Sequence, residues 1–180
     1  QSLGNGPGAG LGTYVGTVRT NGTATVDWIN GAAAANGTAA VLGVWNCYNR
    51  VDVRGTVSDT TDSWVYETVT IRSANNSNTN RVSLVVGLQE DYFEADYSVT
   101  QGNTNGNAGG YAGVGYDSTT AFSGRIGLFR QVATASGALG VVMGDYAVQP
   151  LGFHYLQALE EAYNTQATNN WYGDSGGTTQ

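Results

Sequence analysis

The sequence has no lysine, one cysteine, one histidine and two prolines, and charged residues make up only 12% of its 180 residues. A single cysteine excludes an internal disulfide and a cysteine-rich metal site. A single histidine forms no recognisable metal site by itself. No apolar run approaches the roughly 18 residues of a membrane span, and the net charge of −7 disfavours contact with nucleic-acid phosphates. We therefore expect no metal, no cofactor, no nucleic-acid partner and no membrane insertion.

Glycine, threonine, asparagine and alanine take the place of the missing charges, and glycine alone accounts for 27 residues. A chain of this length is typical of one domain and buries enough surface to need no disulfide. Residues 1–12 alternate glycine with other small residues and predict a flexible arm. Residues 13–173 are expected to form a single domain, followed by a polar tail at 174–180. Cys47 is predicted to be a small core residue.

The clearest strand pattern lies between Val44 and Arg72. Side chains at 64–72 alternate with a period of 2, which fits a strand and not a helix. The run Val41–Val53 carries large side chains suited to a half-buried pleated surface, and turn residues at 58–62 separate the two runs. We expect these runs to be antiparallel neighbours at the centre of the fold.

Turn signals recur every 8–12 residues, which is typical of an all-β sandwich or barrel. Three asparagines that stand in N-x-S/T sequences are interpreted as turn residues rather than glycosylation sites: Asn21, Asn36 and Asn75. Further strands are expected at 13–18, 24–29, 81–89, 111–116, 121–129 and 139–148. Residues 101–110 read as a loop. The predicted fold is an all-β antiparallel sandwich of the jelly-roll type.

Residues 152–163 are compatible with both a helix and a strand. Leu156, Leu159 and Tyr163 have helical spacing, and several residues of the segment are good helix formers. Phe153, Tyr155 and Leu159 would also share one face of a strand. We prefer the strand and expect it to pair with residues 169–172.

Gly173–Gly177 reads GDSGG, the nucleophile motif of chymotrypsin-like serine proteases. That mechanism also needs a histidine base and a buried carboxylate. The one histidine, His154, lies in Gly-Phe-His-Tyr, outside any such motif. We reject the protease, expect Ser175 to be inert, and expect a neighbouring group to satisfy His154.

The acidic segment that follows residue 89 offers a candidate binding site, because carboxylates there alternate with aromatic rings. Mixed aromatic and polar groups are typical of small-ligand sites. The candidate ligand-binding residues are Asp91, Tyr92, Glu94, Asp96 and Tyr97. Two alternatives remain open: a glycosidase pair among Glu90, Asp91, Glu94 and Asp96, or Phe93 and Tyr97 in the core with the acids facing water. For Asp59 and Asp62, the absence of a D-x-D-x-D-G pattern indicates turn capping rather than calcium binding.

Six segments within about residues 40–160 resemble a family of structural proteins of tailed bacteriophages and of phage-like particles such as gene transfer agents. The segments are Trp45–Val51 (WNCYNRV), Asp59–Asn75, Asn80–Ser83, Gly87–Asp91, Gly115–Thr120 and Gly152–Gln157. The resemblance implies a place on the virion, in a tail fibre, tail tip or head spike, and it brings no catalytic motif.

Three functions fit that resemblance. The first is binding of a host-surface glycan or receptor, the second a purely architectural decoration or assembly role, and the third a surface-polysaccharide depolymerase. We expect a non-enzymatic protein that binds host polysaccharide, contacts other virion proteins, and assembles as a homotrimer or homopentamer, because closed rotational symmetry is the usual solution for assemblies.

Overall fold

The computed structural model describes residues 10–48, 51–89, 92–103, 109–124, 126–130, 138–146, 150–165 and 168–173. The backbone alone is described at 103, 126–130 and 138–146. Apart from one turn of 3-10 helix at Ala74–Asn76, the secondary structure of these residues consists of strands, which confirms the all-β prediction. None of the described residues forms a helix that is long and apolar enough to cross a membrane.

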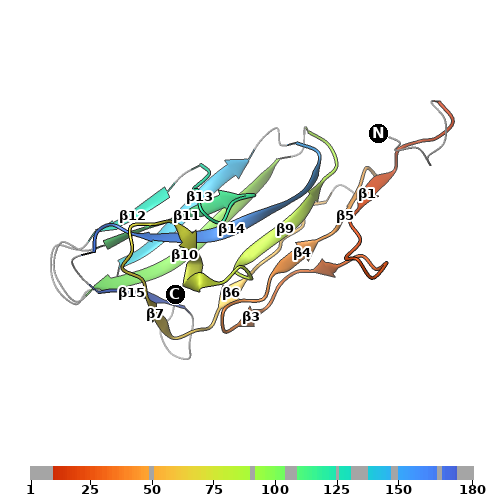
Figure 1. Ribbon diagram of the computed structural model, residues 1–180. Helices are drawn as coiled ribbons and strands as arrows, with labels where there is room; N and C mark the ends of the chain where they lie inside the picture. The colour runs from red at the N-terminus through yellow and green to blue at the C-terminus, as the bar shows by residue number, and fades with distance from the viewer. Residues whose placement is uncertain are drawn as a thin grey trace.

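Two larger sheets carry most of the strands (Figure 1). The four-stranded sheet has the order β13 (Ala138–Tyr146), β10 (Phe93–Asn103), β15 (Asn169–Tyr172) and β7 (Ser63–Val65). The seven-stranded sheet has the order β12 (Ile126–Arg130), β11 (Gly109–Tyr116), β14 (Gly152–Ala162), β9 (Arg81–Val86), β4 (Ala40–Leu42) and β2 (Trp28–Ile29), with β8 (Arg72–Ser73) paired to β14. Two small ribbons complete the fold: β1 (Gly16–Val18) with β5 (Val44–Asn46), and β3 (Ala33–Ala34) with β6 (Ser58–Asp59).

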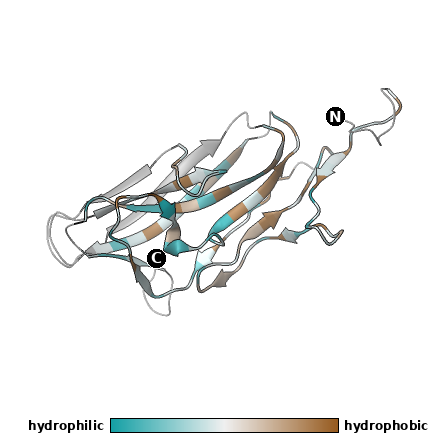
Figure 2. Cartoon of the chain, viewed as in Figure 1, coloured by the Kyte–Doolittle hydropathy of each residue, from teal (hydrophilic) through white to brown (hydrophobic). Residues whose placement is uncertain are grey.

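The core lies between the two larger sheets. One cluster contains Val99 of β10, Ala112 of β11 and Trp171 of β15, none of them more than 2% exposed. A second cluster joins Val114 and Leu156 of the seven-stranded sheet to residues of β10. Hydrophobic and hydrophilic residues alternate along the long strands (Figure 2), as expected where one face of each sheet is buried.

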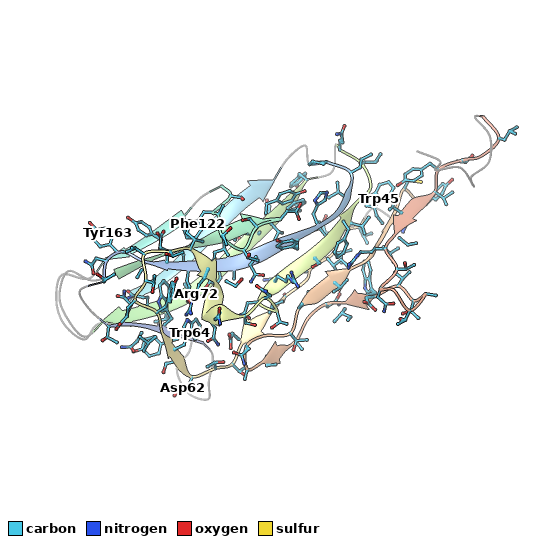
Figure 3. The ribbon with its side chains drawn as sticks, viewed as in Figure 1. Trp45, Asp62, Trp64, Arg72, Phe122 and Tyr163 are labelled. Atoms are coloured by element: carbon cyan, nitrogen blue, oxygen red, sulfur yellow. The ribbon has the colours of Figure 1, made fainter. Side chains whose placement is uncertain are left out.

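The predicted central pair is wrong. β5 pairs with β1, and β7 pairs with β15, so the two runs of the Val44–Arg72 stretch are not neighbours. Figure 3 shows Trp45 and Trp64 well apart. The alternating run at 64–72 is also not one strand: β7 belongs to the four-stranded sheet and β8 to the seven-stranded sheet, so residues 66–71 cross between them.

The ambiguous segment at 152–163 is a strand, and it is the centre of the larger sheet. β14 pairs with β11 on one side and with β9 and β8 on the other. The predicted pairing with residues 169–172 is wrong, because those residues form β15 between β10 and β7. The expected loop at 101–110 is shorter than predicted, since β10 continues to Asn103 and β11 begins at Gly109.

The asparagine turns are confirmed by the backbone. Asn36 and Asn75 have φ angles of 64° and 53°, in the left-handed region that asparagine tolerates. The Asn21 side chain accepts a hydrogen bond of 3.0 Å from the Thr23 amide. The expected strand at 24–29 begins later, because Ala24 has a φ of 63°. Cys47 is half-buried rather than a core residue, with its Sγ 3.4 Å from the carbonyl oxygen of Tyr14.

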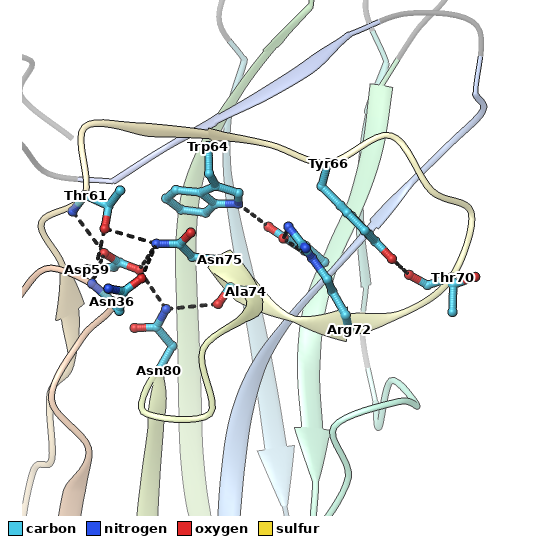
Figure 4. Close-up of polar contacts among 11 residues, drawn as sticks. Asn36, Asp59, Thr61, Trp64, Tyr66, Thr70, Arg72, Ala74, Asn75 and Asn80 are labelled. Atoms are coloured by element: carbon cyan, nitrogen blue, oxygen red, sulfur yellow. Dashed lines mark hydrogen bonds and ion pairs between the residues drawn. The ribbon is translucent and has the colours of Figure 1, made fainter.

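The Asp59 carboxylate connects its own turn to two segments that are distant in sequence, at Asn36 and at 75–80 (Figure 4). Its Oδ1 accepts hydrogen bonds from the amides of Asn36 (2.8 Å) and Thr61 (2.9 Å). Its Oδ2 accepts from the side-chain amides of Asn75 (2.9 Å) and Asn80 (2.8 Å). Turn capping at Asp59 is thus confirmed. Burial by itself would raise the pKa of Asp59, but these hydrogen bonds outweigh it and hold the pKa below the usual value.

Asp59→Asn should lower the free energy of unfolding at pH 7 by on the order of 1–2 kcal/mol, after allowance for the partial exposure of the group. The asparagine side chain has only one oxygen acceptor, so its NH2 group would face N–H groups that now donate to the Asp59 carboxylate. Because the folded pKa is depressed, the contribution of Asp59 is present above the unfolded-state pKa and is lost as the pH falls through the folded one. Urea unfolding at pH 7 and pH 3 measures both effects. Asp52→Asn, at an exposed carboxyl group, is the control, and equal losses for the two variants would contradict the assignment.

Candidate functional site

The outer side of the four-stranded sheet carries a continuous set of polar side chains. Along β10, Glu94, Asp96 and Ser98 are exposed, while Phe93 and Tyr97 project to the opposite side and pack against the core. This alternation is the ordinary period of a strand. The acids therefore lie on the surface of the sheet and not in its interior.

The two neighbouring strands extend this surface. Thr100 lies opposite Tyr172, and Tyr172 lies opposite Ser63, so the three form one row across β10, β15 and β7. Directly opposite residues of an antiparallel pair project to the same side. We call this surface the polar face; its residues are Glu94, Asp96, Ser98, Thr100, Asn170, Tyr172, Ser63 and Val65.

Tyr172 is the aromatic centre of the polar face. Its ring is 37% exposed. A Cβ atom at Gly102 would lie 3.2 Å from Cε2 of this ring, closer than ordinary van der Waals contact, so the ring lies directly against the backbone of β10. A Cβ atom at position 102 would require the ring to shift by a few tenths of an ångström. The result is an aromatic ring supported by the sheet, beside the hydroxyl groups of Thr100 and Ser63. The carboxylates of Asp96 and Glu94 lie four and six residues farther along β10, which is roughly 13 and 20 Å at the rise of a strand.

The predicted site residues divide between the two sides of β10. Glu94 and Asp96 lie on the polar face, and Tyr92 lies just before β10 with 71% of its surface exposed. Tyr97 is turned to the other side, where burial and the carboxylates of Glu160 and Asp59 raise the pKa of its hydroxyl well above the usual value. Asp91 lies outside the described residues, as does the tail 174–180 with Ser175.

The described acids of the candidate site, Glu94 and Asp96, differ from the acid that a glycoside hydrolase requires. A glycoside hydrolase needs a carboxyl group that stays protonated near neutral pH, a state that burial provides. Glu94 and Asp96 are both open to water. Water-accessible carboxylate oxygens can accept hydrogen bonds from ligand hydroxyl groups.

Comparisons with known proteins add no assignment. No family model matches. No curated protein and no solved structure matches the chain either. The resemblance to phage structural proteins therefore remains a prediction from the sequence motifs.

His154 is held at both ring nitrogens, as the sequence predicted. Nδ1 lies 2.6 Å from Oδ2 of Asp117, and Nε2 lies 2.9 Å from the carbonyl oxygen of Pro150. The ring is also stacked on Tyr116, with centroids 5.1 Å apart. Neither nitrogen faces an open space, so His154 fastens the turn after β11 to the start of β14. Among the described residues, no group of three or more potential ligand side chains is arranged to hold a metal ion.

A second charged cluster lies between the sheets and is structural. The carboxylate of Glu160, on β14, is fully buried and receives hydrogen bonds from Trp64 Nε1 (2.7 Å) and Arg72 Nε (2.8 Å). The Arg72 guanidinium in turn lies 3.6 Å from the centre of the Tyr66 ring (Figure 4). Because Trp64 belongs to the four-stranded sheet and Glu160 to the seven-stranded sheet, this cluster joins the two.

The sequence did not indicate the part of the polar face that β15 and β7 supply. Residues 63, 100 and 172 become neighbours only when strands remote in sequence pair. One local signal was available: Trp171 and Tyr172 are adjacent in a strand, so one ring had to face the core and the other the solvent.

Proposed function

We propose that this chain is a structural protein of a virion, in a tail fibre or head spike, and that it binds a host-surface glycan through the polar face. The observation that carries the proposal is the exposed Tyr172 ring, which lies against Gly102 and beside the hydroxyl groups of Thr100 and Ser63, with the carboxylates of Asp96 and Glu94 farther along the same face. Sugars present apolar C–H faces that stack on such rings, and hydroxyl groups that bond to carboxylates and amides. The phage resemblance supplies the virion location.

The proposed fold is a jelly roll extended by additional strands. Numbering β7, β9, β10, β11, β12, β13, β14 and β15 from 1 to 8 gives the pairs 1–8, 2–7, 3–6 and 4–5. This is the pairing of a long hairpin rolled into two four-stranded sheets, the arrangement typical of capsid and lectin domains. β4 and β2 then extend one of the sheets beyond its fourth strand.

The proposal includes self-assembly as a trimer or pentamer and contact with other virion proteins. Several copies around one axis would present several polar faces at once. Because monovalent sugar contacts are weak, such multivalency would raise the overall affinity without new contacts. A purely architectural role is the second candidate, and it is favoured by the large apolar side chains that β1 and β2 leave exposed.

Tyr172→Ala should weaken glycan binding at least about tenfold, or ~1.4 kcal/mol, because it removes the stacking surface. Tyr172→Phe keeps the ring and should retain most of the binding. Asp96→Asn should weaken binding about tenfold through loss of charge-assisted hydrogen bonds, each worth about twice a neutral one. A glycan array, followed by titration of the best ligand, measures these effects.

The matched control is Val69→Ala, an exposed substitution away from the polar face. It should leave both binding and melting temperature unchanged. If the array shows no ligand, or if Tyr172→Ala binds as well as the unmodified protein, the glycan-binding function is wrong.

A further inference from the structure

The N-terminal extension, residues 10–48, leaves an unusual amount of apolar surface uncovered. Six of its large side chains are between 44% and 75% exposed: Tyr14, Val15, Val18, Trp28, Ile29 and Tyr48. Both residues of β2 are in this group, although they project to opposite sides of the seven-stranded sheet. A strand of a finished sheet normally buries at least one side. β2 therefore lies beyond the area that the four-stranded sheet covers.

The extension is nevertheless fastened to the rest of the fold. Trp45 of β5 is stacked on Tyr14, with ring centroids 5.8 Å apart. The Trp45 ring also packs directly on the backbone that follows β9, because a Cβ atom at Gly87 would lie 2.0 Å from this ring. Arg19 adds a contact, with its guanidinium 3.6 Å from the centre of the Phe153 ring. A surface fixed in this way loses little conformational entropy when it binds.

The charge distribution favours contact between identical copies. Arg19 and Asp27 are the only charged residues of the extension, so its net charge is zero, whereas the whole chain carries −7. Arg19 packs on Phe153, and Asp27 accepts a hydrogen bond of 2.9 Å from Asn21. Two copies that meet at this surface therefore meet no net charge repulsion. The same neutrality gives a strongly charged partner nothing to bind.

The exposed area is large for one segment. The three aromatic side chains, each about half exposed or more, contribute roughly 300 Å² given 150–250 Å² for an aromatic side chain, and the three aliphatic side chains add to this. A standard interface takes about 800 Å² from each partner, of which about 60% is apolar. The extension thus supplies part of the apolar surface that contacts with two neighbouring copies require.

We propose that the N-terminal extension is the surface through which copies of this chain pack against one another around a rotation axis. This inference rests on the self-assembly included in the proposed function, and it names the residues responsible. Because Trp28 and Ile29 project to opposite sides of β2, the two sides of the extension contact the two neighbouring copies, with Val18 of β1 contributing to one of these contacts. The polar face remains free on each copy.

The test is the mass of the full chain measured by light scattering after size exclusion. The unmodified protein should be an oligomer, and Val18→Asp and Ile29→Asp should each yield the monomer mass. Val69→Asp, which places the same charge on an exposed valine outside the extension, should keep the oligomer mass. Circular dichroism checks that each variant keeps its strand content. If Val18→Asp does not fold, Val18→Thr, which conserves the shape, should still raise the dissociation constant at least about tenfold.

A monomeric unmodified protein overturns the inference, as does an unchanged oligomer mass for both Val18→Asp and Ile29→Asp. The glycan array separates this result from the proposed binding function. An oligomer that dissociates as expected but binds no glycan contradicts only the polar face. A monomer that still binds glycan through Tyr172 contradicts the extension and the self-assembly, but not the glycan-binding function.

Discussion

Trp171→Ala should lower the free energy of unfolding by about 3–5 kcal/mol, the usual cost of removing a large aromatic side chain from a core. Trp171 is fully buried in the cluster that draws on both larger sheets. Its ring also packs on Gly110, where a Cβ atom would lie 2.4 Å from it. A backbone held this close cannot move in to fill the cavity, so relaxation recovers little of the loss. Chemical unfolding of the purified variant gives the value.

The neighbouring residue provides the control. Tyr172 projects to the opposite side of the same strand and is 37% exposed. Tyr172→Ala should therefore cost about 1 kcal/mol or less, although it removes the proposed binding surface. A loss for Trp171→Ala no larger than that for Tyr172→Ala would mean that the two sheets do not share the core described above.

Glu160→Ala should also be strongly destabilising, by about 3 kcal/mol. It leaves the Arg72 guanidinium and the Trp64 indole without the carboxylate that accepts their hydrogen bonds. Breaking a buried ion pair by removing one partner typically costs 3–5 kcal/mol. We take the lower end because the Arg72 side chain is 25% exposed and retains its contact with Tyr66.

Glu160→Gln tests the effect of the negative charge alone, because glutamine has nearly the same shape as glutamate but does not ionise. Burial raises the pKa of Glu160, and this outweighs the opposing effect of Trp64 and Arg72. A folded-state pKa above the unfolded value gives stability that is fully present below about pH 4.3 and is lost as the pH rises through the folded value. The unmodified protein should therefore lose stability relative to Glu160→Gln between about pH 4 and neutrality. A free-energy difference that stays constant, or that grows in favour of the unmodified protein as the pH rises, would contradict this assignment.

Local patterns predicted the strands well and their neighbours poorly. β9, β11 and β13 lie where residue type and turn spacing placed them, and β11 and β12 pair as two of the expected strands. The errors have one cause. Consecutive segments often enter different sheets, so β7 and β15 each pair with strands remote in sequence. Proximity along the chain therefore suggested pairs, such as β14 with β15, that the fold does not make.

Only about half of the candidate site could be predicted from the sequence, for a related reason. The mixture of acids and aromatic rings identified Glu94 and Asp96, but it also selected Tyr97, which packs against the core. The alternation of β10 separates the two groups, and applying it to residues 93–99 would have excluded Tyr97. Local sequence patterns could not have placed Tyr172 in the site, because only long-range strand pairing brings it beside Thr100.

The position of the last two long strands has a consequence for biosynthesis. β14 lies between β11 and β9, and β15 lies between β10 and β7, yet both are translated after all of these partners. Because protein synthesis proceeds at about 5–20 residues per second, β15 is synthesised on the order of ten seconds after β7, the strand with which it pairs. Throughout that time the nascent chain carries half-formed sheets and the apolar side chains of its N-terminal extension. A ribosome that stalls before Gly152 would release a product with neither sheet complete, and we expect that product to aggregate or be degraded.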